Sequence, residues 1–134
     1  MGVVVAIITD GNKVLIGKLR AEKLVVFGGV PYIFPGGKQE DNENLEQATI
    51  REVKEETGLT ARIVRQIGTR IHPKSGKEIV YFHCEKISGD LSTDDAKNND
   101  IDVLLWVDRG QLSEYMPTLF DAVQDYLKTL SDDN

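Results

Sequence analysis

The stretch of sequence that decides the fold runs from Gly37 to Leu59 and reads GKQEDNENLEQATIREVKEETGL. Within it Glu52, Glu55 and Glu56 are spaced so that all three carboxylates fall on one face of an α-helix. Like charges at these spacings repel and destabilise a helix, whereas a divalent cation over that face makes the cluster favourable. Because the ligands would be hard oxygens, the pattern predicts Mg²⁺ or Mn²⁺ rather than zinc. The alternative is a solvated acidic helix face.

The same stretch contains the clearest helix of the chain, predicted from Asn42 to Thr57. Asn42 can cap the first turn, and the acidic Asp41 and Glu43 suit the positive end of the helix dipole. Gly58 is the expected last residue, because glycine adopts the left-handed conformation that ends many helices.

Strand candidates lie on both sides of this helix. Residues 3–9 and 13–19 flank a tight turn, Asp10-Gly11-Asn12, and predict a hairpin. The remaining candidates are residues 24–27, 30–34, 60–71, 78–87 and 103–107, with a turn at 73–76 between two of them.

A second helix is predicted near the end of the chain, with Pro117 in its first turn and Leu130 near its end. Its apolar stripe is predicted to pack in the core and consists of Leu119, Phe120, Val123, Tyr126, Leu127 and Leu130. Strands flanked by two main helices predict an α/β sandwich, of the α+β type, built as one domain over residues 1–134.

Composition narrows the range of partners and compartments. The net charge of −6 without a Lys/Arg run argues against a nucleic-acid polymer or an anionic membrane as the main partner. The single cysteine, Cys84, excludes an internal disulfide and is predicted to be a buried, inert thiol. The apolar run at residues 3–8 is too short for a signal peptide or a membrane span. A cytoplasmic location is therefore expected.

The deciding stretch also matches a family motif. The Nudix box has the form G-x5-E-x7-R-E-U-x-E-E-x-G-U, where U is a bulky aliphatic residue. Its fixed positions are filled here by Gly37, Glu43, Arg51, Glu52, Val53, Glu55, Glu56, Gly58 and Leu59. The preceding Phe34-Pro35-Gly36-Gly37-Lys38 is similar to the lead-in of MutT-type members. The chain thus resembles the Nudix hydrolases, in particular the small MutT-type pyrophosphohydrolases, and the resemblance implies the Nudix fold, a mixed sheet between helices.

The resemblance also implies roles for individual residues. It makes Glu52, Glu55, Glu56 and Arg51 the catalytic residues, and it assigns the three glutamates and the Gly37 carbonyl to a Mg²⁺ or Mn²⁺ site. Glu43 is expected to support Arg51 from outside the catalytic set. A further acid is expected before the last strand, where Asp100 is the first candidate and Asp102 the second, with Asp94 and Asp95 further back.

Candidate substrate contacts lie outside the acidic cluster. Lys18 and Arg20 stand where MutT-type proteins often place a phosphate-binding base, or they are solvated charges at a strand end. Tyr32 or Phe34 can stack on a nucleobase, with core packing as the alternative. Lys38 can touch phosphate or orient a carboxylate. His72 and His83 have no metal-ligand spacing and are expected to be structural or exposed.

The resemblance implies hydrolysis of a pyrophosphate linkage in a small nucleotide that consists of a nucleoside diphosphate joined to another group. A (deoxy)nucleoside triphosphate cleaved to monophosphate and pyrophosphate is the favoured substrate. One alternative is an ADP-ribose or nucleotide-sugar pyrophosphatase, since Pro73 lies 15 residues after Gly58, near the proline spacing of such members. An alternative of another class is a Nudix-fold module that binds nucleotides without catalysis. Both a monomer and a homodimer are compatible with the sequence.

Overall fold

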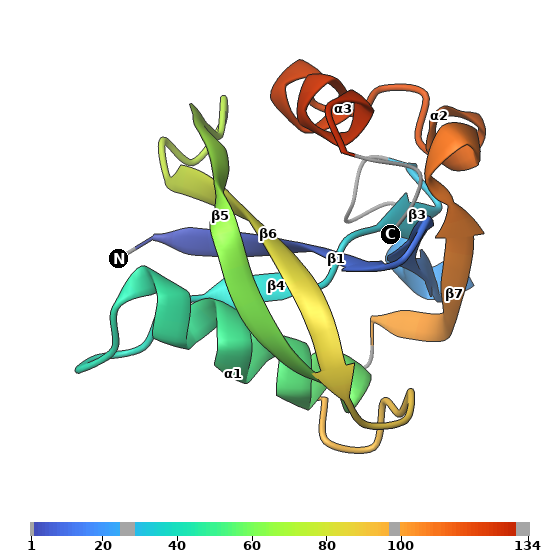
Figure 1. Cartoon of the computed structure of the whole chain (residues 1–134). Helices are drawn as coiled ribbons and strands as arrows, with labels where there is room; N and C mark the ends of the chain where they lie inside the picture. Colours follow the sequence, from blue (N-terminus) through green and yellow to red (C-terminus); the bar gives the residue numbers. More distant parts are fainter. Residues whose placement is uncertain (1, 25–28, 97–99, 131–134) are drawn as a thin grey trace.

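The computed structural model describes residues 2–24, 29–96 and 100–130 of the 134 in the sequence. Its centre is a seven-stranded mixed sheet. Helix α1 (Leu45–Thr57) covers one face, and α2 (Leu112–Tyr115) and α3 (Asp121–Lys128) lie on the other (Figure 1). This arrangement confirms the α+β class. No helix in the described part of the chain is both long and apolar enough to cross a membrane.

The sheet is mixed because its central pair, β1 and β6, is parallel while the other pairs are antiparallel. Its strands are β1 (Val3–Asp10), β2 (Lys13–Leu19), β3 (Tyr32–Ile33), β4 (Gly36–Lys38), β5 (Thr60–Ile71), β6 (Glu78–Ser88) and β7 (Ile101–Asp108). The main path runs β3-β2-β1-β6-β5, with β4 added beside β1 and β7 beside β2. The predicted β1–β2 hairpin and the β5 and β6 segments are confirmed, and β7 is longer than expected.

Each face of the sheet carries its own apolar layer. Alternate residues of a strand point to opposite faces, so Val4, Ala6 and Ile8 of β1 pack toward α1 whereas Ile7 packs toward α3. The same alternation in β6 directs Val80 and Phe82 to the first layer and Ile79 and Tyr81 to the second. The predicted apolar stripe of the last helix lies mainly in this second layer.

Helix α1 begins later than the sequence predicts. The cap is Asn44, not Asn42: its side chain accepts from the N–H of Gln47 at 2.7 Å, and the Gln47 side chain accepts from the N–H of Asn44 at 2.8 Å. This reciprocal capping box satisfies two helix-end donors, which outweighs a single cap at Asn42. Asn42 itself adopts a left-handed φ of 68° in the preceding turn. The helix ends at Gly58 with a φ of 80°, as predicted.

The C-terminal region also differs from the prediction of one helix starting at Pro117. A short helix, α2, ends just before the proline, because a residue that precedes proline avoids the helical conformation, and Met116 has φ −132° and ψ 71°. Pro117 then lies in a turn, and α3 begins only at Asp121. Short 3₁₀ turns, η1 (Ala21–Lys23) and η2 (Arg109–Gln111), complete the described elements. Of the strand predicted at 24–27, residues 25–27 lie outside the described part, and residue 24 lies in a turn.

A buried polar chain links the sheet to α3. The His83 imidazole, 3% exposed, lies 2.8 Å from the Thr9 hydroxyl through Nε2 and 2.7 Å from the Tyr126 hydroxyl through Nδ1. Burial lowers the pKa of His83 below its usual value. Cys84 beside it is fully buried, and burial raises the pKa of its thiol to about 12, in line with the inert role expected from the sequence.

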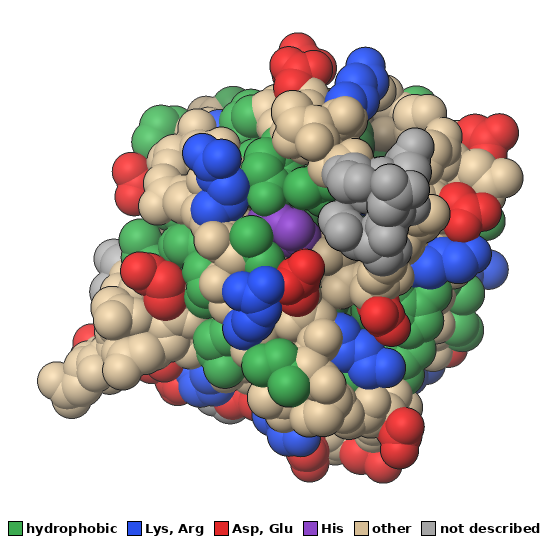
Figure 2. Space-filling view, viewed as in Figure 1, with side chains coloured by type: hydrophobic (Ala, Val, Ile, Leu, Met, Phe, Trp, Pro, Cys, Tyr) green, Lys and Arg blue, Asp and Glu red, His purple; other side chains and the backbone are tan. Residues whose placement is uncertain are grey.

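The face of the molecule over β5 and β6 shows Lys and Arg interspersed with Asp and Glu, with hydrophobic side chains between them (Figure 2). Arg62 and Glu85 form one such pair across β5 and β6. Mixed charge of this kind keeps the surface hydrated without creating a field of one sign.

Candidate active site

Strand β4 and helix α1 bring Gly37 and Glu52 into direct contact. Gly37 pairs with Val4 in β1, so its α-carbon faces the α1 side of the sheet. A Cβ built on Gly37 would lie 2.5 Å from the carboxylate carbon of Glu52, which is closer than real Cβ contacts. Glu52 is itself only 8% exposed. The absence of a side chain at Gly37 is therefore what lets the backbone and this carboxylate share one site.

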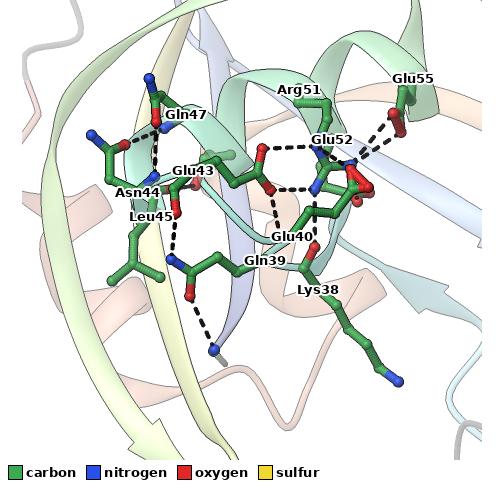
Figure 3. A network of polar contacts seen from close by, with 12 residues as sticks. Lys38, Gln39, Glu40, Glu43, Asn44, Leu45, Gln47, Arg51, Glu52 and Glu55 are labelled. Carbon is green, nitrogen blue, oxygen red and sulfur yellow. Dashed lines mark hydrogen bonds and ion pairs between the residues drawn. The ribbon is translucent and has the colours of Figure 1, made fainter.

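Arg51 joins the acidic residues to one another and to the loop (Figure 3). Its Nε and Nη2 donate to the two carboxylate oxygens of Glu43 at 3.0 and 2.7 Å, which is a bidentate pair. Its Nη1 donates to Glu52 at 2.8 Å and to Glu55 at 3.2 Å. The hydrogen bond to Glu43 and the charge of Glu52 raise the pKa of Arg51 above its usual range.

Glu43 lies before α1 rather than in it, and it ties down the loop that leads into the helix. One of its oxygens accepts from the N–H of Glu40 at 2.7 Å, while its own carbonyl accepts from the side chain of Gln39 at 2.8 Å. The Lys38 carbonyl accepts from Nη2 of Arg51 at 3.0 Å. The loop and the helix face are thus held as one unit through Arg51.

Among the described residues of α1, Glu56 is the glutamate of the cluster that makes no hydrogen bond or ion pair with Arg51. It is 6% exposed, and burial together with the charges of Glu52, Asp100 and Glu55 raises its pKa to about 7. Asp100 lines the same cleft and pairs with Lys23 at 3.3 Å. Asp102 instead pairs with Arg20 at 3.3 Å, away from the residues that line the cleft. Of the two candidates for a distal acid, the structure brings Asp100 to the carboxylates.

Gly37, Glu52, Glu56 and Asp100 line one end of a cleft of about 1200 Å³, whereas Glu55 is not among its described lining residues. The other part of the cleft is mainly apolar and aromatic, and its lining includes Val3, Val5, Tyr32, Phe34, Ile79, Tyr81, Met116, Leu119 and Phe120. The ring of Tyr32 meets Tyr115 edge to face, with 5.2 Å between ring centroids. The cleft therefore combines a carboxylate-rich end with a surface on which a flat ring can stack.

The donor set at the acidic end fits a hard divalent cation. It offers only oxygens, and a dication relieves the carboxylate repulsion that acts together with burial to raise the pKa of Glu56. Within the described residues, no three acidic, histidine or cysteine side chains converge closely enough to hold an ion as they stand. One physical reason is that Nη1 of Arg51 occupies the space between Glu52 and Glu55.

Of the other residues predicted to contact substrate, some line the cleft and some do not. Phe34 and Lys38 line the cleft, and the Lys38 side chain extends away from the Arg51 cluster (Figure 3). Lys18 and Arg20 are not among the cleft-lining residues of the described part. The sequence alone did not single out Arg70, which lines the apolar part of the cleft from β5. Its register opposite Ile79 of β6 becomes evident only when the strands are paired.

Comparisons with known proteins agree with this architecture. A family model described as NUDIX domain matches residues 1–130. A Bacillus subtilis protein named "Putative 8-oxo-dGTP diphosphatase" is 27% identical over 134 residues, covering 99% of this chain and 83% of the relative. An ADP-ribose pyrophosphatase of Methanocaldococcus jannaschii is 36% identical over 96 residues, which cover 68% of this chain and 54% of that protein.

Two solved structures illustrate the likeness in fold. A NUDIX hydrolase from Nitrosomonas europaea superposes with a TM-score of 0.72 at 19% identity, covering 94% of this chain and 69% of that one. A MutT structure described for Aliivibrio salmonicida and Vibrio cholerae gives a TM-score of 0.65 at 23% identity, with 97% of both chains covered. At these identities the superpositions bear on the fold.

Proposed function

Since the chain belongs to the Nudix hydrolase family, we propose that it hydrolyses a pyrophosphate linkage in a nucleoside diphosphate joined to another group, with residues 1–134 as one catalytic domain. The favoured substrate is a (deoxy)nucleoside triphosphate, cleaved to a monophosphate and pyrophosphate. The relative named "Putative 8-oxo-dGTP diphosphatase" supports a nucleoside triphosphate as substrate.

One observation carries this proposal. The Glu52 carboxylate lies against Gly37 at the acidic end of a cleft that also contains Glu56 and Asp100, and the rest of that cleft is lined by aliphatic and aromatic side chains. A nucleotide has the matching division, because its phosphates need cations and its base needs a surface for stacking.

The residues then take defined parts in the reaction. Glu52, Glu55, Glu56, Asp100 and the Gly37 carbonyl would hold Mg²⁺ or Mn²⁺, which when bound neutralises phosphate charge and makes water a better nucleophile. A carboxylate of Glu55 or Glu56 accepts the proton of the attacking water. The water oxygen forms a new bond to phosphorus as the bridging oxygen departs in line on the leaving phosphate.

Arg51 and Glu43 act by position rather than by contact with the reacting atoms. The bidentate pair of Arg51 with Glu43 fixes the guanidinium, which in turn orients the carboxylates of Glu52 and Glu55. Orientation of this kind contributes to rate because small displacements of catalytic groups are costly. No covalent intermediate with the protein is needed.

A second candidate substrate class is ADP-ribose or another nucleotide-sugar. It is favoured by the 36% identity to an ADP-ribose pyrophosphatase, although this chain spans 54% of that protein. The position of Pro73 supports it weakly, since Pro73 also suits the β5–β6 turn in which it lies.

The test is a panel of nucleoside triphosphates, ADP-ribose and nucleotide-sugars, assayed with Mg²⁺ or Mn²⁺ for release of phosphate and pyrophosphate. Cleavage in ¹⁸O-labelled water then identifies the phosphorus that is attacked. We expect turnover that stops in EDTA. Undiminished turnover in EDTA would contradict the mechanism, and nucleotide binding without metal-dependent turnover would favour a non-catalytic module.

The buried thiol of Cys84 fits a reducing compartment and supports a cytoplasmic location for this activity. Dilution followed by light scattering would decide between the monomer and the homodimer expected from the sequence.

A further inference from the structure

Arg70 stands at the end of the cleft opposite the acidic cluster. Four residues are aligned across four neighbouring strands: Lys38 of β4 pairs with Val3 of β1, Val3 with Ile79 of β6, and Ile79 with Arg70 of β5. Three strand spacings separate the two ends of this row, which is about 14 Å between the backbones of Lys38 and Arg70. Residues directly opposite in a sheet share a face, so Arg70 points to the α3 side together with Ile79.

The Arg70 side chain is fixed at this end. Its Nε donates to the Tyr81 hydroxyl at 2.9 Å, and its guanidinium carbon lies 5.9 Å from the centre of the Phe120 ring. Tyr81 is only 6% exposed, so the group that holds Arg70 is itself immobilised by packing. These two contacts already restrict the rotamers of Arg70. The side chain therefore loses less conformational entropy when it binds a ligand than a mobile arginine would lose.

Arg70 forms no ion pair with an acidic side chain among the described residues. Within the described residues, the ion pairs of the chain do not include Arg70, whereas Arg51 in the same cleft is surrounded by carboxylates. Among the cleft-lining residues, Arg70 contacts Tyr81 and Phe120 and lies opposite Ile79 in the sheet, and His72 and Lys74 line the cleft beyond it. Both terminal nitrogens of a guanidinium are donors, and an apolar wall strengthens any hydrogen bond that they make.

From this placement we propose that Arg70 is a specificity-determining residue, which recognises a carbonyl oxygen on the edge of a nucleobase bound in the apolar part of the cleft. Tyr81 is the residue that positions it. This inference rests on the proposed function, in which the phosphates lie at Gly37 and Glu52. A base with a carbonyl acceptor, such as guanine, uracil or thymine, satisfies the donors of Arg70. Adenine offers an amino group there and leaves them unpaired.

A contact between Arg70 and the phosphates is the main competing role, and geometry argues against it. The phosphates are proposed to lie beside Gly37, at the far end of the row that separates Lys38 from Arg70. A phosphate contact would also affect every base equally, because phosphate is common to all nucleotides. Base selectivity therefore distinguishes the two roles.

The test compares Arg70→Met, Arg70→Lys and the control Arg65→Met. Arg65 lies on the same strand and also sits over an aromatic ring, at 5.7 Å from the centre of Tyr126, but it does not line the cleft. For Arg70→Met we expect kcat/KM for the keto-base triphosphates to fall about 10- to 100-fold, with adenine substrates changed less than about 3-fold. Arg70→Lys should recover part of the loss, and Arg65→Met should retain the wild-type selectivity. An equal loss for all bases, or unchanged selectivity in Arg70→Met, would overturn the proposal.

A binding measurement keeps the proposal separate from the question of hydrolysis. Calorimetry with nucleoside 5′-monophosphates in metal-free buffer should give tighter binding of GMP and UMP than of AMP, and Arg70→Met should abolish the difference. If selective binding is found without turnover of any nucleotide, the proposed hydrolase function fails while the role of Arg70 stands. Equal binding of the three nucleotides by the wild type, or no binding of any of them, refutes that role.

Discussion

Substituting Gly37 by alanine should disturb the candidate active site while the protein remains folded. The added Cβ would lie 2.5 Å from the carboxylate carbon of Glu52 and 2.5 and 2.7 Å from its oxygens. Ordinary contacts begin near 3.4 Å, so the carboxylate has to move by about 1 Å. It can do so because it is the end of a flexible side chain rather than backbone.

The cost follows from the contact that this movement breaks. The Glu52 carboxylate accepts from Nη1 of Arg51 at 2.8 Å, and a shift of that size loses most of a charge-assisted bond, about 1.5 to 3 kcal/mol. The loss is offset by about 0.4 to 1 kcal/mol, because alanine has fewer unfolded conformations than glycine. The net loss of about 1 to 2 kcal/mol corresponds to a fall in Tm of about 4 to 8 °C for a chain of this length.

The effect on function should be larger than the effect on stability. Misplacing a catalytic or metal-binding group by about 1 Å costs about 100-fold in rate. We therefore expect Gly37→Ala to remain folded by circular dichroism, with kcat/KM reduced about 100-fold and the Mg²⁺ concentration for half-maximal activity raised.

Gly36→Ala is the matched control. Its added Cβ would collide with the backbone carbonyl of Val4, which is paired in β1 and cannot retreat. We expect this variant to lose more than about 3 kcal/mol of stability. Wild-type activity in Gly37→Ala, or unfolding of both variants to the same extent, would refute the argument that the Glu52 carboxylate yields and the Val4 backbone does not.

Three further changes test other parts of the site and core. A double-mutant cycle of Arg51→Met and Glu43→Gln, followed by urea unfolding, should give a coupling energy of about 1 to 3 kcal/mol from their bidentate pair, and a value below about 0.5 kcal/mol would remove that pair as the brace. Glu56→Gln should lower kcat at least 100-fold while the circular dichroism spectrum is kept; near wild-type turnover would exclude Glu56 from the reaction. Because burial lowers the native pKa of His83, the unfolded chain binds more protons below about pH 6.5, and stability should fall there with a slope of up to about 1.4 kcal/mol per pH unit. Urea titrations of His83→Gln should lack this component, whereas an identical pH dependence in both proteins would contradict it.

The sequence predicted most of the elements because their signals are local. The alternation of β1 and β2, the turn between them and the glycine at the end of α1 each depend on a few adjacent residues. The helix start was missed although its signal is also local. Asn42 and Asn44 are both suitable cap residues by type, but only Asn44 is followed three positions later by a side chain, Gln47, that completes a capping box.

Features that depend on strand pairing could not be predicted in the same way. The closeness of Gly37 to Glu52 follows from the antiparallel pairing of β4 with β1, and the position of Arg70 follows from the pairing of β5 with β6. Asp100 and Asp102 differ by only two residues, yet one lines the cleft and the other meets Arg20 outside it. Sequence spacing carries no information about such long-range neighbours without the register.

The ion pairs of Arg51 change how the carboxylate cluster is interpreted. Repulsion among Glu52, Glu55 and Glu56 first suggested that a cation is needed to make this helix favourable. In the structure, Arg51 already compensates Glu52 and Glu55 from within the same helix. Burial, together with the charges of Glu52, Asp100 and Glu55, raises the pKa of Glu56 to about 7. We therefore expect the helix to fold without metal. A protein stripped with EDTA should keep its circular dichroism spectrum and lose its turnover, and unfolding on removal of metal would show that Arg51 does not hold the cluster together by itself.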